Sequence, residues 1–184
     1  APLSLGVKLA LDRFYSEGLK TAGPKSKWQA RVEEVRARIA GFLGAHPSEI
    51  AFTKNTSEGL NVAANALPLA TGDNVLVIAG DHPNNAYAFL NLRRKGIDVR
   101  FVPFTGETVD SEAIVPFIDA HTRAVSLSHV TFHAGHVFDI AGIGRMCAEK
   151  GLHLVIDAMQ SVGVLPVDIS QVRPSMLAFG CHKG

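Results

Sequence analysis

The sequence is poor in cysteine, in net charge and in long apolar runs. Its two cysteines, Cys147 and Cys181, lie too far apart for a CxxC motif and are too few for a disulfide framework. This scarcity favours a reducing compartment, and we expect a cytoplasmic protein. Lys and Arg number 18 against 17 Asp and Glu, so no bulk charge favours a nucleic-acid or membrane-surface partner.

Signals for secretion, membrane insertion and nucleotide binding are also scarce. Residues 1–11 hold no apolar run of signal-peptide length behind a basic start, although a mature product whose signal had been removed would look the same. No stretch approaches the ~20 apolar residues of a membrane span. The sequence contains neither a Walker lysine motif nor a GxGxxG fingerprint, which disfavours ATP or a dinucleotide as ligand.

Strand and helix patterns alternate along the chain. Short runs rich in Val and Ile are apolar throughout, which predicts strands buried on both faces, at 75–79, 99–102, 124–127 and 152–156. Helical patterns fall at 24–43, 58–66, 85–94, 111–120 and 140–150. The alternation predicts an α/β fold, a mostly parallel sheet flanked by helices, with binding sites at the carboxyl ends of the strands.

Two residues at predicted strand ends suggest a specific chemistry. Asp157 ends one apolar run, and Lys183 follows the apolar stretch 176–179. An aspartate that holds a pyridine nitrogen protonated and a lysine that forms an imine with an aldehyde are what pyridoxal phosphate chemistry requires. Taken singly, Asp157 is equally consistent with a turn-capping residue and Lys183 with a solvated one. Together they favour the cofactor.

Other polar residues flank the same predicted strand ends. Thr56 and Ser57 lie between a short predicted strand and a helix beginning near Glu58, where hydroxyls and free backbone N–H groups can bind a phosphate. The alternative is that Thr56 is only an N-cap. His82 follows the strand at 75–79, so its imidazole could stack on a bound aromatic ring or exchange protons, or be a turn residue.

Four further histidines raise the question of a metal site: His121, His129, His133 and His136. Only helical geometry would bring His129 and His133 together, yet this segment follows a strand and contains Gly135. We therefore expect no metal. We interpret these histidines as loop residues that line one side of the cleft.

In order and spacing, the polar motifs resemble the aminotransferase class V family of fold-type I pyridoxal-phosphate enzymes, which includes cysteine desulfurases and isopenicillin N epimerase-like proteins. The matching stretches are 53–61, 81–85, 128–130, 157–161 and 182–183. The resemblance implies that Lys183 forms the imine, that Asp157 pairs with the pyridine nitrogen and that His82 stacks on the ring. It also implies that Gln160 contacts the ring hydroxyl and that Thr56, Ser57 and His182 contact the phosphate.

The chain departs from the family pattern at three places. Phe132 stands where many desulfurase-like members have an asparagine beside the ring, and Gly180 replaces a serine that often contacts the phosphate. Cys181 is too close to Lys183 to be the mobile sulfur-accepting cysteine, so we interpret it as structural. Family members continue well beyond the lysine. We therefore expect residues 1–184 to be part of the large, cofactor-binding domain, with the C-terminal small domain outside this chain.

The resemblance implies an enzyme that acts on an amino acid through Lys183, assisted by His82 and Asp157, and that forms a homodimer. Transamination, desulfuration and epimerisation all stay open as outcomes. One alternative is a non-catalytic fragment or degenerate homologue that serves as a binding module. Another is a doubly wound nucleotide-binding protein whose motifs match by coincidence.

Overall fold

The computed structural model describes residues 2–21, 23–104 and 110–183. The chain divides into two compact units, residues 1–52 and 53–184. Within the described ranges, no helix combines the length and the apolar character needed to cross a membrane.

The first unit contains the helices α1 (Leu5–Thr21) and α2 (Lys25–Leu43) and a short 3-10 turn, η1 (Pro47–Glu49). Helix α2 follows Pro24 and ends at Gly44, whose φ of 75° is the left-handed conformation that glycine adopts readily. This confirms the helix predicted at 24–43. Glu17 of α1 accepts a hydrogen bond from the Trp28 indole N–H of α2 at 3.0 Å. No residue of α1 is buried, although several of its side chains are large and apolar.

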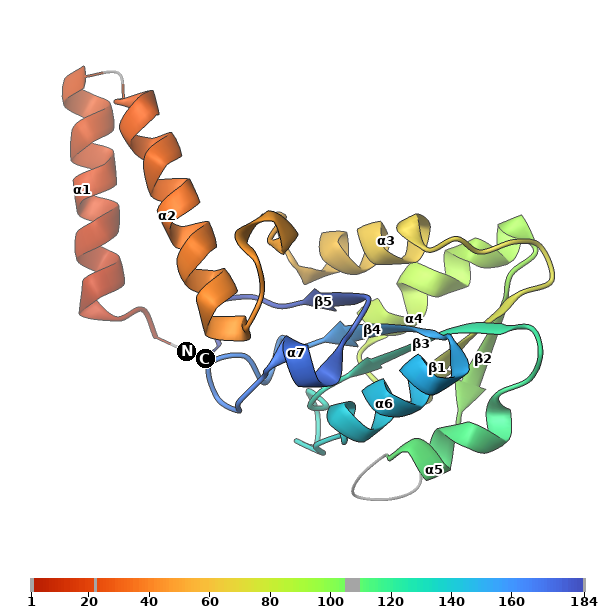
Figure 1. Ribbon diagram of the computed structural model, residues 1–184. Helices are drawn as coiled ribbons and strands as arrows, with labels where there is room; N and C mark the ends of the chain where they lie inside the picture. The colour runs from red at the N-terminus through yellow and green to blue at the C-terminus, as the bar shows by residue number, and fades with distance from the viewer. Residues whose placement is uncertain (1, 22, 105–109, 184) are drawn as a thin grey trace. The chain divides into compact units, whose positions relative to one another are not determined.

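The second unit is built on a five-stranded, all-parallel sheet in the order β2-β1-β3-β4-β5 (Figure 1). The strands are β1 (Asn74–Ile78), β2 (Asp98–Val102), β3 (Thr122–Ser128), β4 (His153–Asp157) and β5 (Met176–Ala178). The parallel α/β prediction is confirmed, and the four predicted strands lie where the apolar runs placed them. The fifth strand, β5, lies within the apolar stretch at 176–179 that precedes Lys183.

Helices cover both faces of this sheet. Figure 1 shows α3 (Thr56–Ala66) and α4 (Pro83–Leu90) on one face, and α5 (Ser111–Ile114), α6 (Ile140–Lys150) and α7 (Ile169–Val172) on the other. Two 3-10 segments, η2 (Asn91–Lys95) and η3 (Val115–Phe117), continue α4 and α5. The predicted helix at 140–150 is confirmed. The predicted helix at 111–120 is wrong beyond 117, because Pro116 turns the chain into the short η3 segment.

The core lies between the sheet and the helices. Leu60 of α3, Val77 of β1 and Phe89 of α4 belong to one cluster and are fully buried. Burying each such side chain contributes about 1.5–3 kcal/mol. On the other face, α6 approaches α7 so closely that a Cβ added to Gly144 would lie 2.0 Å from the Val172 carbonyl oxygen. Glycine at 144 therefore permits this packing.

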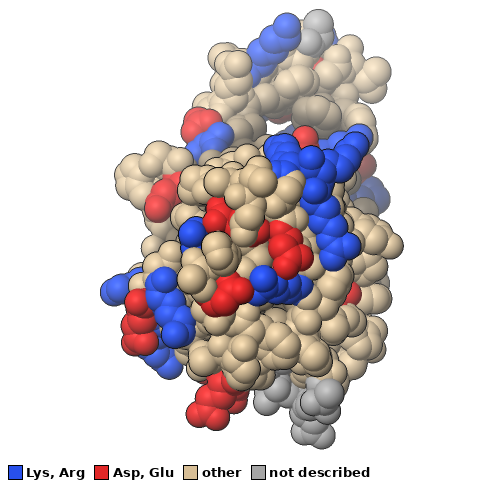
Figure 2. Space-filling view, turned by 90° about the vertical axis from the view of Figure 1, so that its right-hand side faces the viewer, with Lys and Arg blue, Asp and Glu red and all other residues tan. Residues whose placement is uncertain are grey.

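Charged side chains on the outer edge of the sheet are paired. Arg100 of β2 binds Asp98 at 2.7 Å and Asp119 at 2.5 Å. The Arg100 guanidinium, together with N–H donors from His121 and Asn74, holds the pKa of Asp119 well below its usual range. Figure 2 shows acidic and basic side chains intermingled on the face at this side of the molecule. The pair between Arg100 and Asp119 joins β2 to the connection that enters β3.

Candidate functional site

A cavity of about 220 Å³ lies at the carboxyl ends of β1, β3 and β4. We call it the strand-end cavity. Six of the seven residues that the sequence predicted for the site line it: Thr56, His82, Asp157, Gln160, His182 and Lys183. The seventh, Ser57, does not line it but follows Thr56 in the first turn of α3. The residues meet because parallel strands deliver their carboxyl ends to one edge of the sheet.

Asp157 is the last residue of β4 and is only 5% exposed. Its Oδ1 accepts a hydrogen bond from the Met159 N–H at 2.9 Å, and within the described ranges no donor reaches Oδ2. Burial raises the pKa of Asp157, the Met159 hydrogen bond opposes this shift, and the nearby Asp81 charge adds to it. A buried carboxylate with a free oxygen is suited to pair with a cation or with a protonated ring nitrogen.

His82 directly precedes α4 and caps it, because its Nδ1 accepts a hydrogen bond from the Asn84 N–H at 3.2 Å. Pro83 at the first helical position helps to start this helix. The Phe132 ring, from the segment after β3, also lines the strand-end cavity and contacts the imidazole. The imidazole is therefore held by the backbone N–H of Asn84 on one side and by the Phe132 ring on the other.

The N-terminus of α3 offers free donors to the same cavity. Asn55 is the N-cap, since its side chain accepts a hydrogen bond from the Glu58 N–H at 2.9 Å. The alternative of Thr56 as N-cap is therefore wrong, and so is the short strand predicted before it. Among the described residues, nothing accepts a hydrogen bond from the N–H of Thr56 or Ser57. These amides lie at the positive end of the helix and could bind an anion.

Lys183 and His182 reach the cavity from the turn after β5, and both are exposed. This turn packs closely, because a Cβ at Gly180 would meet the terminal methyl of Met159 at 2.8 Å. The nearest atoms belong to the mobile end of the Met159 side chain, which can move aside, so this contact does not by itself require glycine at position 180. Cys181 is exposed and free, contrary to the structural role expected for it.

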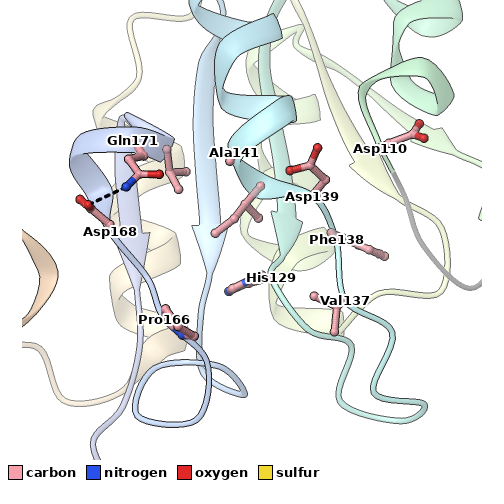
Figure 3. A pocket seen from close by; sticks show the side chains of 11 residues that line it. Asp110, His129, Val137, Phe138, Asp139, Ala141, Pro166, Asp168 and Gln171 are labelled. Atoms are coloured by element: carbon pink, nitrogen blue, oxygen red, sulfur yellow. Dashed lines mark hydrogen bonds between the residues drawn. The ribbon is translucent and has the colours of Figure 1, made fainter.

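The four histidines are loop residues, as expected, but none of them lines the strand-end cavity, so that part of the interpretation is wrong. Successive side chains after β3 alternate in direction. Ser128 and Val130 line the strand-end cavity, while His129 between them lines a larger cavity of about 570 Å³ near the N-termini of α6 and α7 (Figure 3). His129 is 6% exposed, and burial lowers its pKa.

Three carboxylates line this larger cavity, as Figure 3 shows: Asp110, Asp139 and Asp168. Each caps the helix that follows it by accepting a backbone N–H. Capping the N-termini of α5, α6 and α7 therefore explains why these three aspartates lie here. Across the described ranges, no three His, Cys, Asp or Glu side chains are grouped so that they could hold a metal ion.

Comparison with known proteins identifies the family. The model of the aminotransferase class-V family matches residues 10–184. The chain belongs to this family. Along its whole length it is 39% identical to a probable cysteine desulfurase of Methanothermobacter thermautotrophicus and 37% identical to an uncharacterized protein of Schizosaccharomyces pombe. It spans 47% and 43% of those two proteins, a little under half of their length.

Solved structures show the same fold for this class V chain. A mutant of C-DES with glycine covalently linked to its PLP cofactor superimposes with a TM-score of 0.90 at 25% identity, over 98% of this chain and 50% of that one. The apo cysteine desulfurase of Thermococcus onnurineus matches with a TM-score of 0.83 at 27% identity, over 97% of this chain and 46% of that one. The expected fold, part of the large domain of fold-type I enzymes, is confirmed.

Proposed function

We propose that the chain supplies the cofactor-binding part of a pyridoxal-phosphate enzyme that acts on an amino acid. One observation carries the proposal: six polar residues, spread from Thr56 to Lys183 in the sequence, line a single cavity. The names of similar proteins support it, since they include cysteine desulfurases and a C-DES carrying PLP.

The groups around the strand-end cavity fit this cofactor. The Oδ2 of Asp157, which no donor among the described residues reaches, would accept a hydrogen bond from the protonated pyridine nitrogen, and His82 would cover one face of the ring. The unpaired N–H groups at the start of α3 would bind the phosphate, with His182 beside them. Gln160 would donate to the ring hydroxyl.

When bound, pyridoxal phosphate draws electrons from the α-carbon of the amino acid joined to it. Lys183 would anchor the cofactor and, once released, its uncharged Nζ would accept the proton from that α-carbon and return it. Asp157 would keep a negative charge against the ring nitrogen. Its burial strengthens this interaction, because few waters compete for the carboxylate.

The names of similar proteins favour a sulfur-containing amino acid as substrate. Two of them are called cysteine desulfurases, and a further structure is described as the cystine C-S lyase C-DES with cysteine persulfide, its reaction product. We propose cysteine or a close analogue, with desulfuration ahead of transamination or epimerisation. We also propose a cytoplasmic homodimer, which the exposed apolar side chains of α1 support.

The test is to trap the cofactor in the protein expressed from its complete gene. We expect a yellow protein whose visible absorbance disappears on borohydride reduction. Peptide mapping should then find the reduced phosphopyridoxyl group on Lys183. The Lys183→Ala variant should lose this adduct and all turnover of amino acids, while Lys150→Ala, at the exposed end of α6, should keep both.

Other results would favour the alternatives. A protein that stays colourless and unmodified after cofactor is added would favour the non-catalytic binding module. Tight binding of ATP or NAD would favour the nucleotide-binding protein. Turnover that survives in Lys183→Ala would remove Lys183 from the mechanism.

A further inference from the structure

Asp81 lies in the turn after β1, one residue before His82, and its carboxylate accepts hydrogen bonds from three N–H donors. Its Oδ1 accepts a hydrogen bond from the His82 N–H at 2.6 Å. Its Oδ2 accepts one from the Ser128 N–H at 2.7 Å and one from the Asn85 side-chain amide at 3.1 Å. Hydrogen bonds to an ionised carboxylate are roughly twice as strong as neutral ones.

Asn85 extends this network into the core. It is 1% exposed, and its Nδ2 also donates to the Ser128 Oγ at 3.0 Å. Its Oδ1 accepts a hydrogen bond from the Ser126 hydroxyl at 3.3 Å. All the polar atoms of this buried amide therefore have partners, and such satisfied networks hold their members in one arrangement.

The network connects two strands that carry different parts of the strand-end cavity. Asp81 and His82 follow β1, whereas Ser128 ends β3 and is the register partner of Asp157 on β4. The Asp157 carbonyl also accepts a hydrogen bond from the His129 N–H at 2.9 Å. The backbone of His82 is thus tied, through one carboxylate, to the strand end beside Asp157.

We propose that Asp81 is a positioning residue of the cofactor site, because its carboxylate fixes the backbone of His82 relative to Asp157. Asp81 itself does not line the strand-end cavity. It would act through His82, by adding a hydrogen bond on the backbone to the contacts that Asn84 and Phe132 make with the imidazole. This inference rests on the proposed function, because it concerns the placement of the ring-covering residue.

The negative charge of Asp81 also affects the protonation of Asp157 in the same site. Its negative charge raises the pKa of Asp157, whereas His82 and Lys183 lower it. An asparagine at position 81 would remove this charge. It would also turn an NH₂ group toward one of the N–H donors, so it could not accept all three hydrogen bonds.

The experiment uses the protein expressed from its complete gene and loaded with pyridoxal phosphate. Asp81→Asn, His82→Ala and the double variant are compared by visible circular dichroism per bound cofactor, which reports how asymmetrically the ring is held. Asp168→Asn is the matched control, because Asp168 also accepts N–H donors but caps α7. We expect a several-fold loss of signal in Asp81→Asn, none in Asp168→Asn, and no further loss when Asp81→Asn is added to His82→Ala.

A second readout needs no cofactor. In apo protein with ¹³C-labelled histidine, the His82 ring signal is assigned by its absence in His82→Ala. We expect Asp81→Asn to shift the His82 signal more than those of the other histidines. Asp81→Glu keeps the charge but moves the carboxylate, so it should shift the signal too, and it replaces Asp81→Asn if the latter does not fold.

Several outcomes would overturn the inference. One is an Asp81→Asn variant whose circular dichroism is unchanged, and another is a double variant whose loss of circular dichroism equals the sum of the two single losses. A third is a His82 ring signal that shifts no more than the signals of the other histidines. If the wild-type protein binds no cofactor, the proposed function fails on its own, and the His82 signal still decides whether Asp81 positions this residue.

Discussion

The Phe132 ring meets the His82 ring edge-on, with ring centroids 4.7 Å apart and an angle of 77° between the planes. This is the geometry that aromatic pairs prefer. The resemblance to desulfurase-like enzymes implies an asparagine, able to bind the ring hydroxyl, where this chain has Phe132. In this chain the position supports the imidazole by packing.

We predict that Phe132→Ala weakens cofactor binding by roughly 2- to 10-fold, because an aromatic pair contributes about 0.5–1.5 kcal/mol. The measurement is a fluorescence titration of the apo protein with pyridoxal phosphate. Phe101→Ala is the matched control, because Phe101 is similarly exposed but lies on β2 and does not line the strand-end cavity. Equal affinities of the two variants would contradict the prediction.

Asp157→Asn should change how the stability of the apo protein depends on pH. Burial raises the pKa of Asp157, so its ionised form is disfavoured in the folded state. The wild-type protein should therefore lose stability relative to the variant as pH rises from about 4, the ordinary pKa of aspartate, to the raised value. Thermal unfolding midpoints of both apo proteins, measured over a pH series, test this.

Asp168→Asn serves as the control, because the pKa of Asp168 is shifted in the opposite direction from that of Asp157. Hydrogen bonds from Ser170 lower the pKa of Asp168, so its stabilisation is present above the ordinary aspartate pKa and is lost as pH falls. Identical pH profiles for the two variants would show that Asp157 is not a desolvated carboxylate.

The two cysteines should differ sharply in reactivity. Burial raises the pKa of the Cys147 thiol to about 12, whereas Cys181 is exposed. Because the thiolate is the reactive form, iodoacetamide at neutral pH should modify Cys181 and leave Cys147 intact. Peptide mapping after a short reaction gives the result, and both residues should react once the protein is unfolded in guanidinium. Modification of Cys147 in the native protein would contradict its burial.

Gly144→Ala should destabilise the protein by about 1–3 kcal/mol, the usual cost of forcing extra atoms into a packed region. The new Cβ would lie 2.0 Å from the Val172 carbonyl oxygen, so α6 and α7 would have to separate. Gly41→Ala, in α2, meets no atom within 4 Å and should instead be neutral or stabilising by up to ~1 kcal/mol. Urea unfolding of both variants measures the difference, and a stable Gly144→Ala protein would argue against the close helix packing.

Much of the fold and of the candidate site could be predicted from local sequence. Strands at the centre of a parallel sheet are buried on both faces, so they appear as uninterrupted apolar runs, as at 75–79. Polar residues that follow such runs meet at one sheet edge, which is why Asp157 and His82 share a cavity with Lys183. Helix α1 was not predicted from the sequence. Two local contacts support this helix: Ser4 accepts a hydrogen bond from the Val7 N–H, and Lys8 pairs with Asp12 one turn later.

Other features depend on details that spacing does not reveal. Asn55 and Thr56 can both cap a helix, and only the backbone conformation decides which one does. The direction of His129 depends on the alternation of side chains past the end of β3. The Asp81 network joins residues that are 47 positions apart in the sequence, so no local pattern indicates it.

The order of the sheet also bears on how the protein is made. After β3 has paired with β1, β4 is added beside β3 and β5 beside β4 (Figure 1). The sheet can therefore grow outward while the chain is still being synthesised. Lys183 follows all five strands, so Thr56, His82 and Asp157 can be in position before the anchoring amine leaves the ribosome. Attachment of the proposed cofactor to Lys183 would then follow the assembly of these five strands rather than nucleate it.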